Sequence, residues 1–381
     1  MKIAILTPWT ISPVAVGGTE RFVIDLANSL SKLGNLVDVY MLSGKEYKEN
    51  AINYKSINLF GNNKIIDEFF LREQFNNFSL KESYQLLAYK IESLIDLSEY
   101  DLIQLNSQLF LNCFKNKKRV FTIHTNPFEY KLDWGKKAFD TMVDIMYEEY
   151  INNNAIFVAP SVFYSKEYSK IAKVKVKYIP HAIDVNRINS SKDYNYICNS
   201  LNLNCNKKII LLPSRLEPIQ KQPMLFMRAF AKLDNCIKDK FQVVCTGADK
   251  QYIQYKEDIE NFCKKNNIDI VITRFEDMSD AYKVASIVVL PSQSESFGYS
   301  ALESLSLGIP TILNGIPTYK EIVENSKNSY IFDKTEESLF ETIKIVLKND
   351  LSRIYQEESW INQYKLDLFG TKYLDLLNVN F

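Results

Sequence analysis

Two glutamates separated by seven residues lie in segment 291–303, which reads PSQSESFGYSALE. Glu295 falls in a polar loop, where its carboxylate can accept a hydrogen bond from a sugar hydroxyl. Glu303 falls on the helix that follows, where it can bind a diol such as a ribose through both oxygens. The backbone N–H groups after Phe297 would face a phosphate, because the start of a helix attracts anions. The alternative is a serine-capped helix with Glu303 on its surface, but the leucines around Glu303 indicate a buried helix, where a carboxylate needs a partner.

Two cations, Arg215 and Lys221, follow the predicted strand 208–213 and precede a predicted helix. A diphosphate leaving group gains negative charge as its bond to the sugar breaks, and fixed cations stabilise that charge. Arginine would supply forked hydrogen bonds and lysine a compact charge. The alternative is a solvated surface pair. The position after a strand favours the phosphate-binding interpretation.

The N-terminal half contributes Gly17, Gly18 and His124 as candidates. Two glycines before a helix let the backbone approach a ligand and leave N–H groups available to an anion. The alternative is a flexible turn capped by Thr19. His124 lies at the carboxyl end of the predicted strand 119–125, where it can contact a polar sugar or bond to the local backbone, and both interpretations stay open.

Strands and helices alternate along almost the whole chain, and this alternation must position the candidate residues. It predicts an α/β fold of two doubly wound units in series, each a parallel sheet covered by helices on both faces. Ligands of such sheets bind at the carboxyl ends of the strands, where the candidates lie. A polar, asparagine-rich stretch at 186–206 is the expected linker. The expected strands are residues 2–8, 36–42, 101–105, 119–125, 155–159, 208–213, 241–246, 269–273, 286–291 and 310–313, and two expected helices are 19–33 and 78–97.

Composition excludes several classes of protein. Lys and Arg (46) balance Asp and Glu (46), so no net charge favours binding to nucleic acid. The six cysteines contain no C-x-x-C pair and only two histidines are present, which argues against a zinc site. We expect Cys245 to be a core residue and all six to be reduced thiols.

Location is expected to be cytoplasmic, because neither a signal peptide nor an apolar membrane span is recognisable. Two groups of basic residues could still touch an anionic lipid or a lipid-linked acceptor at the inner face of the membrane. The alternative, a solvated basic face, is favoured by the near neutrality of the first half. The groups are Lys115, Lys117, Lys118 and Arg119, and Lys131, Lys136 and Lys137 around Trp134.

Gly17-Gly18, Ser214-Arg215 with Lys221, and Glu295-x7-Glu303 together resemble family 4 of the retaining glycosyltransferases. The likeness extends over nearly the whole chain, and the E-x7-E segment is its most specific part. It implies a GT-B fold, with two doubly wound Rossmann-like domains facing a cleft. The N-terminal acceptor-side domain would be 1–185 plus about 362–381, and 186–361 would bind the nucleotide sugar. A C-terminal helix around 360–377 would cross back to the first domain.

The resemblance implies a hexosyltransferase-type enzyme (EC 2.4.-) that uses a nucleotide-diphosphate sugar, with uridine the preferred base, and no metal or other cofactor. The acceptor would be a glycan, a lipid-linked sugar or a protein, with specificity in loops 60–82 and 127–138. The implied catalytic residues are His124, Glu295, Arg215 and Lys221. The implied donor-binding residues are Gly17, Gly18, Arg215, Lys221, Arg274, Phe275, Glu295, Phe297, Gly298, Tyr299 and Glu303.

Each implied role follows from its matching position. Arg215 and Lys221 would hold the phosphates, Glu303 the ribose and Glu295 the donor sugar. Gly17 and Gly18 would approach the pyrophosphate, and His124 would lie near the reacting carbon. The backbone of 297–299 would lie beside the sugar and phosphate, and segment 274–276 beside the base.

The chain departs from the family pattern at two places. Ser214 replaces the usual glycine before the arginine, and His181-Ala182 replaces the usual Asn-Gly.

Two other functions would involve the same nucleotide-sugar ligand. One is a sugar-nucleotide epimerase of the same fold, and the other is a non-catalytic nucleotide-sugar binding protein.

Overall fold

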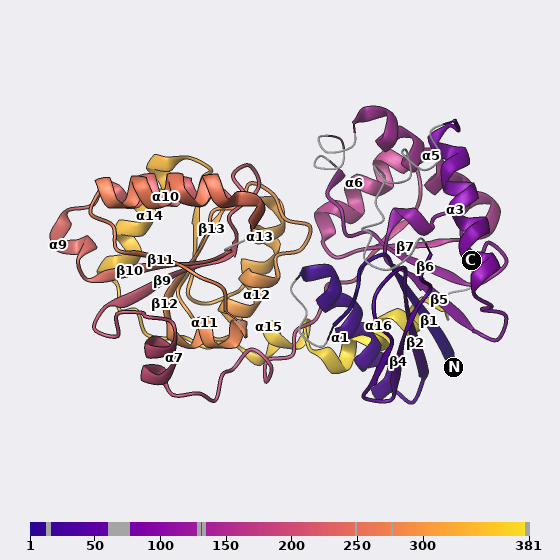
Figure 1. Cartoon of the computed structure of the whole chain (residues 1–381), viewed down its shortest axis with the longest axis horizontal. Helices are drawn as coiled ribbons and strands as arrows, with labels where there is room; N and C mark the ends of the chain where they lie inside the picture. The colour runs from indigo at the N-terminus through magenta and orange to yellow at the C-terminus, as the bar shows by residue number, and fades with distance from the viewer. Residues whose placement is uncertain are drawn as a thin grey trace. The chain divides into compact units, whose positions relative to one another are not determined.

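The computed structural model of the chain describes residues 1–12, 17–59, 77–127, 131, 135–247, 250–275 and 277–377 (Figure 1). The chain separates into two compact units. Unit 1 consists of Met1–Ala182 and Gln363–Phe381, and unit 2 of Ile183–Asn362. The observed division falls a few residues before the predicted domain boundary at 185.

Unit 1 is built on an eight-stranded sheet in the described residues, with strand order β3-β4-β2-β1-β5-β6-β7-β8. All neighbouring strands are parallel except the antiparallel pair β3 and β4. The strands are β1 (Lys2–Thr7), β2 (Leu36–Met41), β3 (Tyr47–Glu49), β4 (Ile52–Ser56), β5 (Leu102–Leu105), β6 (Arg119–Thr122), β7 (Ile156–Ala159) and β8 (Val176–Tyr178). The helices are α1 (Gly18–Lys32), α3 (Leu80–Leu94), η1 (Gln108–Phe110), α5 (Lys136–Asn153), α6 (Val162–Ala172), α16 (Leu366–Leu374) and η3 (Asp375–Leu377).

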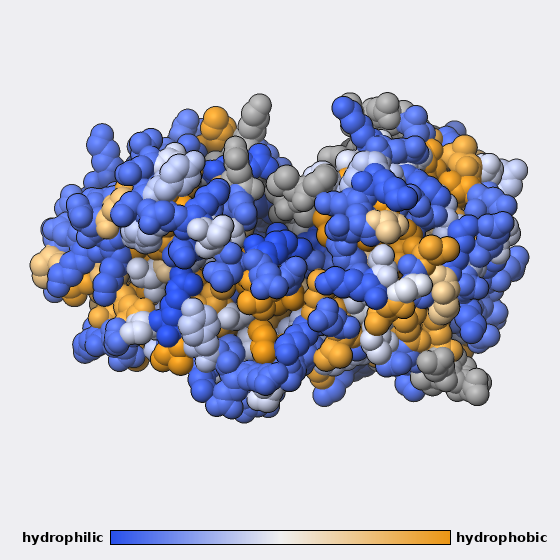
Figure 2. Space-filling view, turned by 90° about the horizontal axis from the view of Figure 1, so that it is seen from below, coloured by the Kyte–Doolittle hydropathy of each residue, from blue (hydrophilic) through white to orange (hydrophobic). Residues whose placement is uncertain are grey.

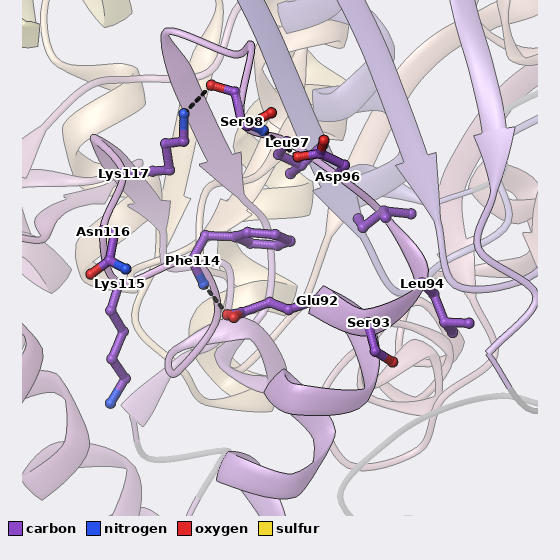
Figure 3. A pocket seen from close by; sticks show the side chains of 11 residues that line it. Glu92, Ser93, Leu94, Asp96, Leu97, Ser98, Phe114, Lys115, Asn116 and Lys117 are labelled. Atoms are coloured by element: carbon purple, nitrogen blue, oxygen red, sulfur yellow. Dashed lines mark hydrogen bonds between the residues drawn. The ribbon is translucent and has the colours of Figure 1, made fainter.

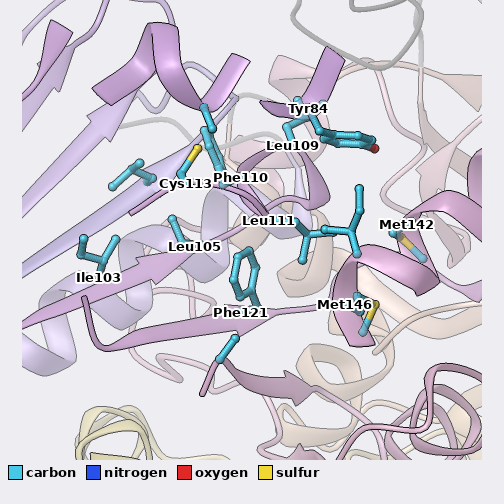
Figure 4. Packing of buried hydrophobic residues seen from close by; sticks show 14 of the residues in the cluster. Tyr84, Ile103, Leu105, Leu109, Phe110, Leu111, Cys113, Phe121, Met142 and Met146 are labelled. Carbon is cyan, nitrogen blue, oxygen red and sulfur yellow. The ribbon is translucent and has the colours of Figure 1, made fainter. Parts of the chain in front are cut away.

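Successive strand residues of unit 1 point into two separate hydrophobic cores, as the alternation of a strand requires. Leu6 and Phe121 join a core formed with α3, α5 and α6, part of which is drawn in Figure 4. Ile5 and Val120 join the other core, which α1 and α16 complete. The sheet is therefore buried on both faces, and its ligand-accessible groups must lie at the strand ends.

Unit 2 contains a six-stranded parallel sheet in the described residues, with order β11-β10-β9-β12-β13-β14. Ile210 and Val243 face a core completed by α8, α10 and α14, whereas α11 packs against β9, and α12 against β12 and β13. The strands are β9 (Lys208–Arg215), β10 (Phe241–Gly247), β11 (Ile270–Ile272), β12 (Ala285–Leu290), β13 (Thr311–Asn314) and β14 (Ser329–Phe332). The helices are α7 (Tyr194–Ser200), α8 (Pro223–Ala231), α9 (Asn235–Lys238), η2 (Lys250–Tyr252), α10 (Ile253–Lys265), α11 (Met278–Val284), α12 (Tyr299–Ser306), α13 (Pro317–Val323), α14 (Glu336–Lys348) and α15 (Glu358–Asn362).

Four strands, β3, β4, β8 and β14, are absent from the predicted set. They are short and lie at or near the edges of their sheets. Such strands lack the continuous apolar run that marks a strand buried on both faces. Two predicted strand ends were wrong by more than one residue, because β6 ends at Thr122 and β9 extends to Arg215.

The predicted linker 186–206 is wrong as a linker, because it contains α7 and belongs to unit 2. Asp193 caps this helix by accepting hydrogen bonds from two backbone N–H groups, at 2.9 and 3.1 Å. Ile197 and Cys198 are buried, and α7 packs against α11. The asparagines that suggested a linker flank one short helix with a small apolar face.

The predicted C-terminal helix 360–377 is divided into α15, α16 and η3, and only the last two belong to unit 1. Trp360 of α15 stays in unit 2, where its indole N–H donates to the Ile322 carbonyl at 2.9 Å. In α16, Gly370 lies against α1, and its N–H donates to the Ser29 hydroxyl at 2.7 Å. Tyr373 shares a hydrogen bond of 2.8 Å with Thr122 of β6. The chain therefore returns to unit 1 after α15.

On the face shown in Figure 2, orange hydrophobic residues are interspersed with blue hydrophilic ones. Within the described part of the chain, no helix has the length and apolarity that a membrane span requires.

All six cysteines lie in described segments and are free, and Cys245 is a core residue of unit 2, as predicted.

Candidate functional site

The carboxyl edge of the unit 2 sheet brings the loops after β9 and β12 together. The Gln293 N–H donates to the Gln220 carbonyl at 2.7 Å, and the Gln220 side chain donates back to the Ser294 carbonyl at 3.3 Å. Because β9 and β12 are neighbours in the sheet, their loops meet at one edge. This contact places Lys221 beside Glu295.

Lys221 and Glu295 form an ion pair, with Nζ 2.6 Å from Oε1. The side chains are 13% and 17% exposed, so the pair is partly shielded from water yet reachable from the edge. The loop that carries Lys221 is shaped by Glu217, whose carboxylate accepts the N–H groups of Ile219 at 3.0 Å and Lys221 at 3.1 Å. Glu217 was absent from the predicted site, although an acidic residue followed by a short polar loop is typical of such a turn.

Arg215 is the last residue of β9, and its side chain is exposed. No hydrogen bond or ion pair joins it to another described residue, including Lys221 and Glu295. Its backbone is tightly packed, since a Cβ at Gly247 of the adjacent strand would lie 2.4 Å from the Arg215 Cα. The strand end is thus fixed, while the guanidinium group is open to an anion in solution.

Helix α12 begins at the same edge, after β12. Its cap residue, Gly298, has a φ of +107° and provides no side-chain hydrogen bond to the first turn. Phe297 is buried before it, and the Ser300 hydroxyl in the first turn donates to the Pro213 carbonyl at 3.2 Å. The first turn of α12 therefore lies near the end of β9, with N–H groups that its cap side chain does not satisfy. Tyr299, the first residue of α12, is half-buried.

Glu303 lies on α12 and is only 6% exposed. Its Oε2 accepts a hydrogen bond of 2.8 Å from the hydroxyl of Tyr282, a fully buried residue of α11. The sequence predicted that a glutamate on this helix needs a partner but not which residue supplies it. No pattern in the sequence links Tyr282 to Glu303, because the contact depends on how α11 and α12 lie on the sheet.

The segment after β11 is only partly suited to the predicted contact with a base. Arg274 is exposed and makes no hydrogen bond or ion pair with another described residue. Phe275 is 8% exposed, so most of its ring is covered by protein. Glu276 lies outside the described residues. Arg274 is therefore the accessible side chain of the pair.

The carboxyl edge of unit 1 holds both histidines of the chain. His124 follows β6, and its ring centroid lies 4.6 Å from that of Phe22 and 5.5 Å from that of His181. Its Nε2 lies 3.4 Å from the Asn106 side-chain oxygen. Burial lowers the pKa of His124 to about 3. The pKa of His181 is well below its usual value, first because of burial and second because His124 is close. Both imidazoles are neutral at neutral pH.

Gly17 and Gly18 mark the start of α1, as predicted. Gly17 is the cap residue, and its carbonyl accepts the Arg21 N–H at 3.1 Å. No side chain caps the helix, and Thr19 lies within its first turn rather than before it. Residues 13–16 of the preceding loop are outside the described chain. The Glu20 side chain lies against this cap, because a Cβ at Gly17 would clash with its carboxylate.

The lowered pKa values of His124 and His181 predict loss of stability in mild acid. Because their folded pKa values lie below the ordinary value near 6.5, the unfolded chain binds protons first, and stability falls as pH decreases from about 6.5 toward 3. One such histidine contributes up to about 1.4 kcal/mol per pH unit. Thermal unfolding should therefore depend less on pH between 6.5 and 4.5 in His124→Asn than in the wild type. Equal slopes would show that His124 is not held neutral.

A surface cavity of about 520 Å³ lies at the amino ends of β5 and β6, away from the candidate residues (Figure 3). Lys115 and Lys117 line it, but both are bound internally: Lys115 pairs with Glu149 at 2.8 Å, and Lys117 donates to the Ser98 carbonyl. Arg119 is fully buried and pairs with the same Glu149 at 2.7 Å. Three of the four residues of this basic group are thus engaged within unit 1.

Two models of known protein families match this chain, and each covers most of one of the two units. Residues 16–187 match the family model described as Glycosyltransferase Family 4, and residues 195–365 match that of Glycosyl transferases group 1. Together these stretches cover most of the chain. A relative described as an uncharacterized glycosyltransferase, from Methanocaldococcus jannaschii, is 24% identical over 393 residues, which is 95% of each chain.

Two solved structures share the architecture at low sequence identity. Sucrose-phosphate synthase from Thermosynechococcus elongatus is 16% identical with a TM-score of 0.76, over 99% of this chain and 98% of that one. HepE from Anabaena, solved in complex with UDP and glucose, is 16% identical with a TM-score of 0.72 over all of both chains. At these identities the likeness shows the fold, which is the two-unit α/β architecture called GT-B.

Proposed function

The chain belongs to the family 4-like glycosyltransferases of the GT-B fold, and we propose that it transfers a hexose from a UDP-sugar with retention of anomeric configuration. One observation carries the choice of donor site. Lys221, Glu295 and the first turn of α12 gather at one edge of the unit 2 sheet, where β9 ends with the exposed Arg215. A nucleotide-diphosphate sugar would use all of these groups. Its phosphates would bind the two cations and the helix N-terminus, and its hydroxyl groups would bind the carboxylates.

The proposed reaction breaks the bond between the anomeric carbon and the β-phosphate oxygen of the donor. Arg215, Lys221 and the N–H groups of α12 stabilise the charge that develops on the departing diphosphate. The acceptor oxygen bonds to the anomeric carbon on the same face, and its proton passes to a phosphate oxygen of the leaving group. Glu303 binds the ribose, and Glu295 accepts a hydrogen bond from the donor sugar.

We also propose that transfer requires no metal ion, because this chain supplies cations where the leaving charge forms. UDP binding by HepE supports the choice of nucleotide. The roles of Gly17, Gly18 and His124 toward the donor stay predictions, as do those of Arg274 and Phe275. A glycan, lipid-linked sugar or protein remains the proposed acceptor class, and most of the predicted acceptor loops 60–82 and 127–138 falls outside the described residues.

A panel of nucleotide sugars tests this function with the full chain. We expect slow release of UDP from one UDP-sugar in the absence of acceptor, unchanged by EDTA and abolished in Glu295→Ala. Nuclear magnetic resonance of the products would report the anomeric configuration. Formation of an epimer from donor alone would instead identify an epimerase, and binding without any turnover would identify a non-catalytic protein. Loss of activity with EDTA, restored by a divalent metal, would contradict the metal-free proposal.

A further inference from the structure

Glu295 is held through one of its two carboxylate oxygens. Lys221 Nζ lies 2.6 Å from Oε1, and the hydroxyl of Tyr319 donates to the same Oε1 at 3.2 Å. The other oxygen, Oε2, accepts no hydrogen bond from any residue in the described segments. Two protein groups thus fix the orientation of the carboxylate while leaving one oxygen for a ligand.

Tyr319 is fixed by its surroundings. It lies on α13 and is 1% exposed. Burial, followed by the nearby Glu295 carboxylate, holds the pKa of the Tyr319 phenol well above its usual value. The hydroxyl therefore keeps its proton at any working pH and acts as a hydrogen-bond donor to Glu295.

The ring of Tyr319 also contacts the start of α12. A Cβ built on Gly298 would lie 2.8 Å from Cε1 of this ring, closer than atoms of a side chain can approach. The ring therefore packs directly on the backbone of the glycine that caps α12. One buried residue thus connects the orientation of Glu295 to the position of the helix N-terminus.

Glu303 accepts its hydrogen bond from a different tyrosine, and comparing the two tyrosine–glutamate pairs helps to test the role of Tyr319. Tyr282 of α11 donates to Glu303 Oε2 at 2.8 Å, whereas Tyr319 of α13 serves Glu295. The two glutamates of the E-x7-E segment are therefore held by different helices. If Glu303 binds ribose and Glu295 binds the donor sugar, the two tyrosines should affect different parts of the same substrate.

We propose that Tyr319 is a positioning residue of the donor site, which orients Glu295 so that Oε2 receives a hydroxyl of the donor sugar. This role rests on the proposed function. The Tyr319 hydroxyl restricts rotation of the carboxylate before the donor binds, so less ordering is needed in the transition state. Tyr319 itself touches Glu295 and Gly298, and acts on the substrate through them.

The test compares three tyrosine-to-phenylalanine variants of the full chain, each of which removes a single hydroxyl. In Tyr319→Phe we expect kcat for turnover of the preferred UDP-sugar to fall about tenfold, because Glu295 loses one hydrogen bond to its charged carboxylate. The Kd for UDP should stay within about twofold, because Glu295 is proposed to contact the sugar and not the nucleotide. In Tyr282→Phe we expect the Kd for UDP to rise about tenfold. Tyr330→Phe is the control and should change neither quantity, since the Tyr330 hydroxyl makes two long contacts of 3.5 Å, with Asn328 and Asn349, and none with a candidate residue.

The split between kcat and UDP affinity separates positioning from simple packing. Equal losses of UDP affinity and kcat in Tyr319→Phe, or no loss in either, would overturn the positioning role while leaving the proposed function intact. A wild-type chain that binds no UDP and turns over no UDP-sugar would overturn the choice of donor, and the role of Tyr319 with it. Circular dichroism and thermal unfolding of each variant would show that the fold is retained.

Discussion

Replacing Lys221 by alanine is expected to lower kcat/KM for donor turnover by about a hundredfold. A preorganised group that stabilises developing charge contributes on the order of 3 kcal/mol to the transition state, and Lys221 is held in place by the partly buried Glu295 at 2.6 Å. Most of the loss should appear in kcat, because the charge on the diphosphate grows as the sugar departs. Steady-state release of UDP from the preferred UDP-sugar measures the effect.

Lys232 offers a matched control for this variant. It also forms ion pairs, with Glu336 at 3.0 Å and Glu337 at 2.9 Å, but the Lys232 and Glu337 side chains are exposed and that of Glu336 is half-buried. Lys232→Ala should leave kcat/KM within about twofold of the wild type, because a surface ion pair contributes about 1 kcal/mol or less to stability. Lys232 also lies at the C-terminal end of α8, whereas Lys221 precedes the start of this helix. An unchanged kcat/KM in Lys221→Ala would show that this lysine does not bind the diphosphate.

Replacing Gly298 by alanine is expected to destabilise unit 2 by about 3 kcal/mol. The φ of +107° is unfavourable for any residue with a Cβ, and the new methyl group would meet the Tyr319 ring at 2.8 Å and the Ile322 side chain at 3.3 Å. Strained backbone and overpacking each cost about 1–3 kcal/mol. Hydrogen exchange should increase in α12 and α13, and donor turnover should fall, since the start of α12 can no longer hold its position.

Gly34→Ala separates backbone strain from the steric clash. Gly34 has a φ of +82°, and a Cβ there would meet no atom within 4 Å. The Gly34→Ala variant should lower the free energy of unfolding by only about 1–2 kcal/mol, the penalty of a left-handed conformation. Hydrogen exchange in α12 should not change. If Gly298→Ala lowers the free energy of unfolding by no more than Gly34→Ala does, the Tyr319 ring moves aside easily to admit the methyl group. In that case its contact with Gly298 would not fix the start of the helix.

Strand-helix alternation predicted most of the sheet of each unit because buried parallel strands are continuous apolar runs. β1, β7, β10 and β12 belong to this class. Edge strands such as β8, in which only the first residue is buried, carry no such run and were not predicted. The stretch 186–206 was misassigned because α7 has just one buried turn, and the polar residues around it outnumber the apolar ones.

The sequence indicated the charged residues and the helix starts of the candidate site, but not the contacts between side chains. Glu295, Glu303 and Lys221 were named from residue type and spacing, and the structure pairs Lys221 with Glu295. Arg215 is not joined to that pair by any hydrogen bond or ion pair between described residues. The partners Tyr282 and Tyr319 were missed because a buried tyrosine on a short helix has the same pattern whether it fills a core or binds a carboxylate.

The amino-acid sequence by itself determined which charged residues follow strands of the parallel sheets, and parallel strands necessarily bring those positions to one edge. Tertiary structure alone decided which atoms meet there. The contact between Tyr319 and Glu295 spans 24 residues and requires α13 to pack on the cap of α12. A hydrogen bond of about 3 Å depends on side-chain packing at the scale of tenths of an ångström, and periodicity along the chain does not contain that information.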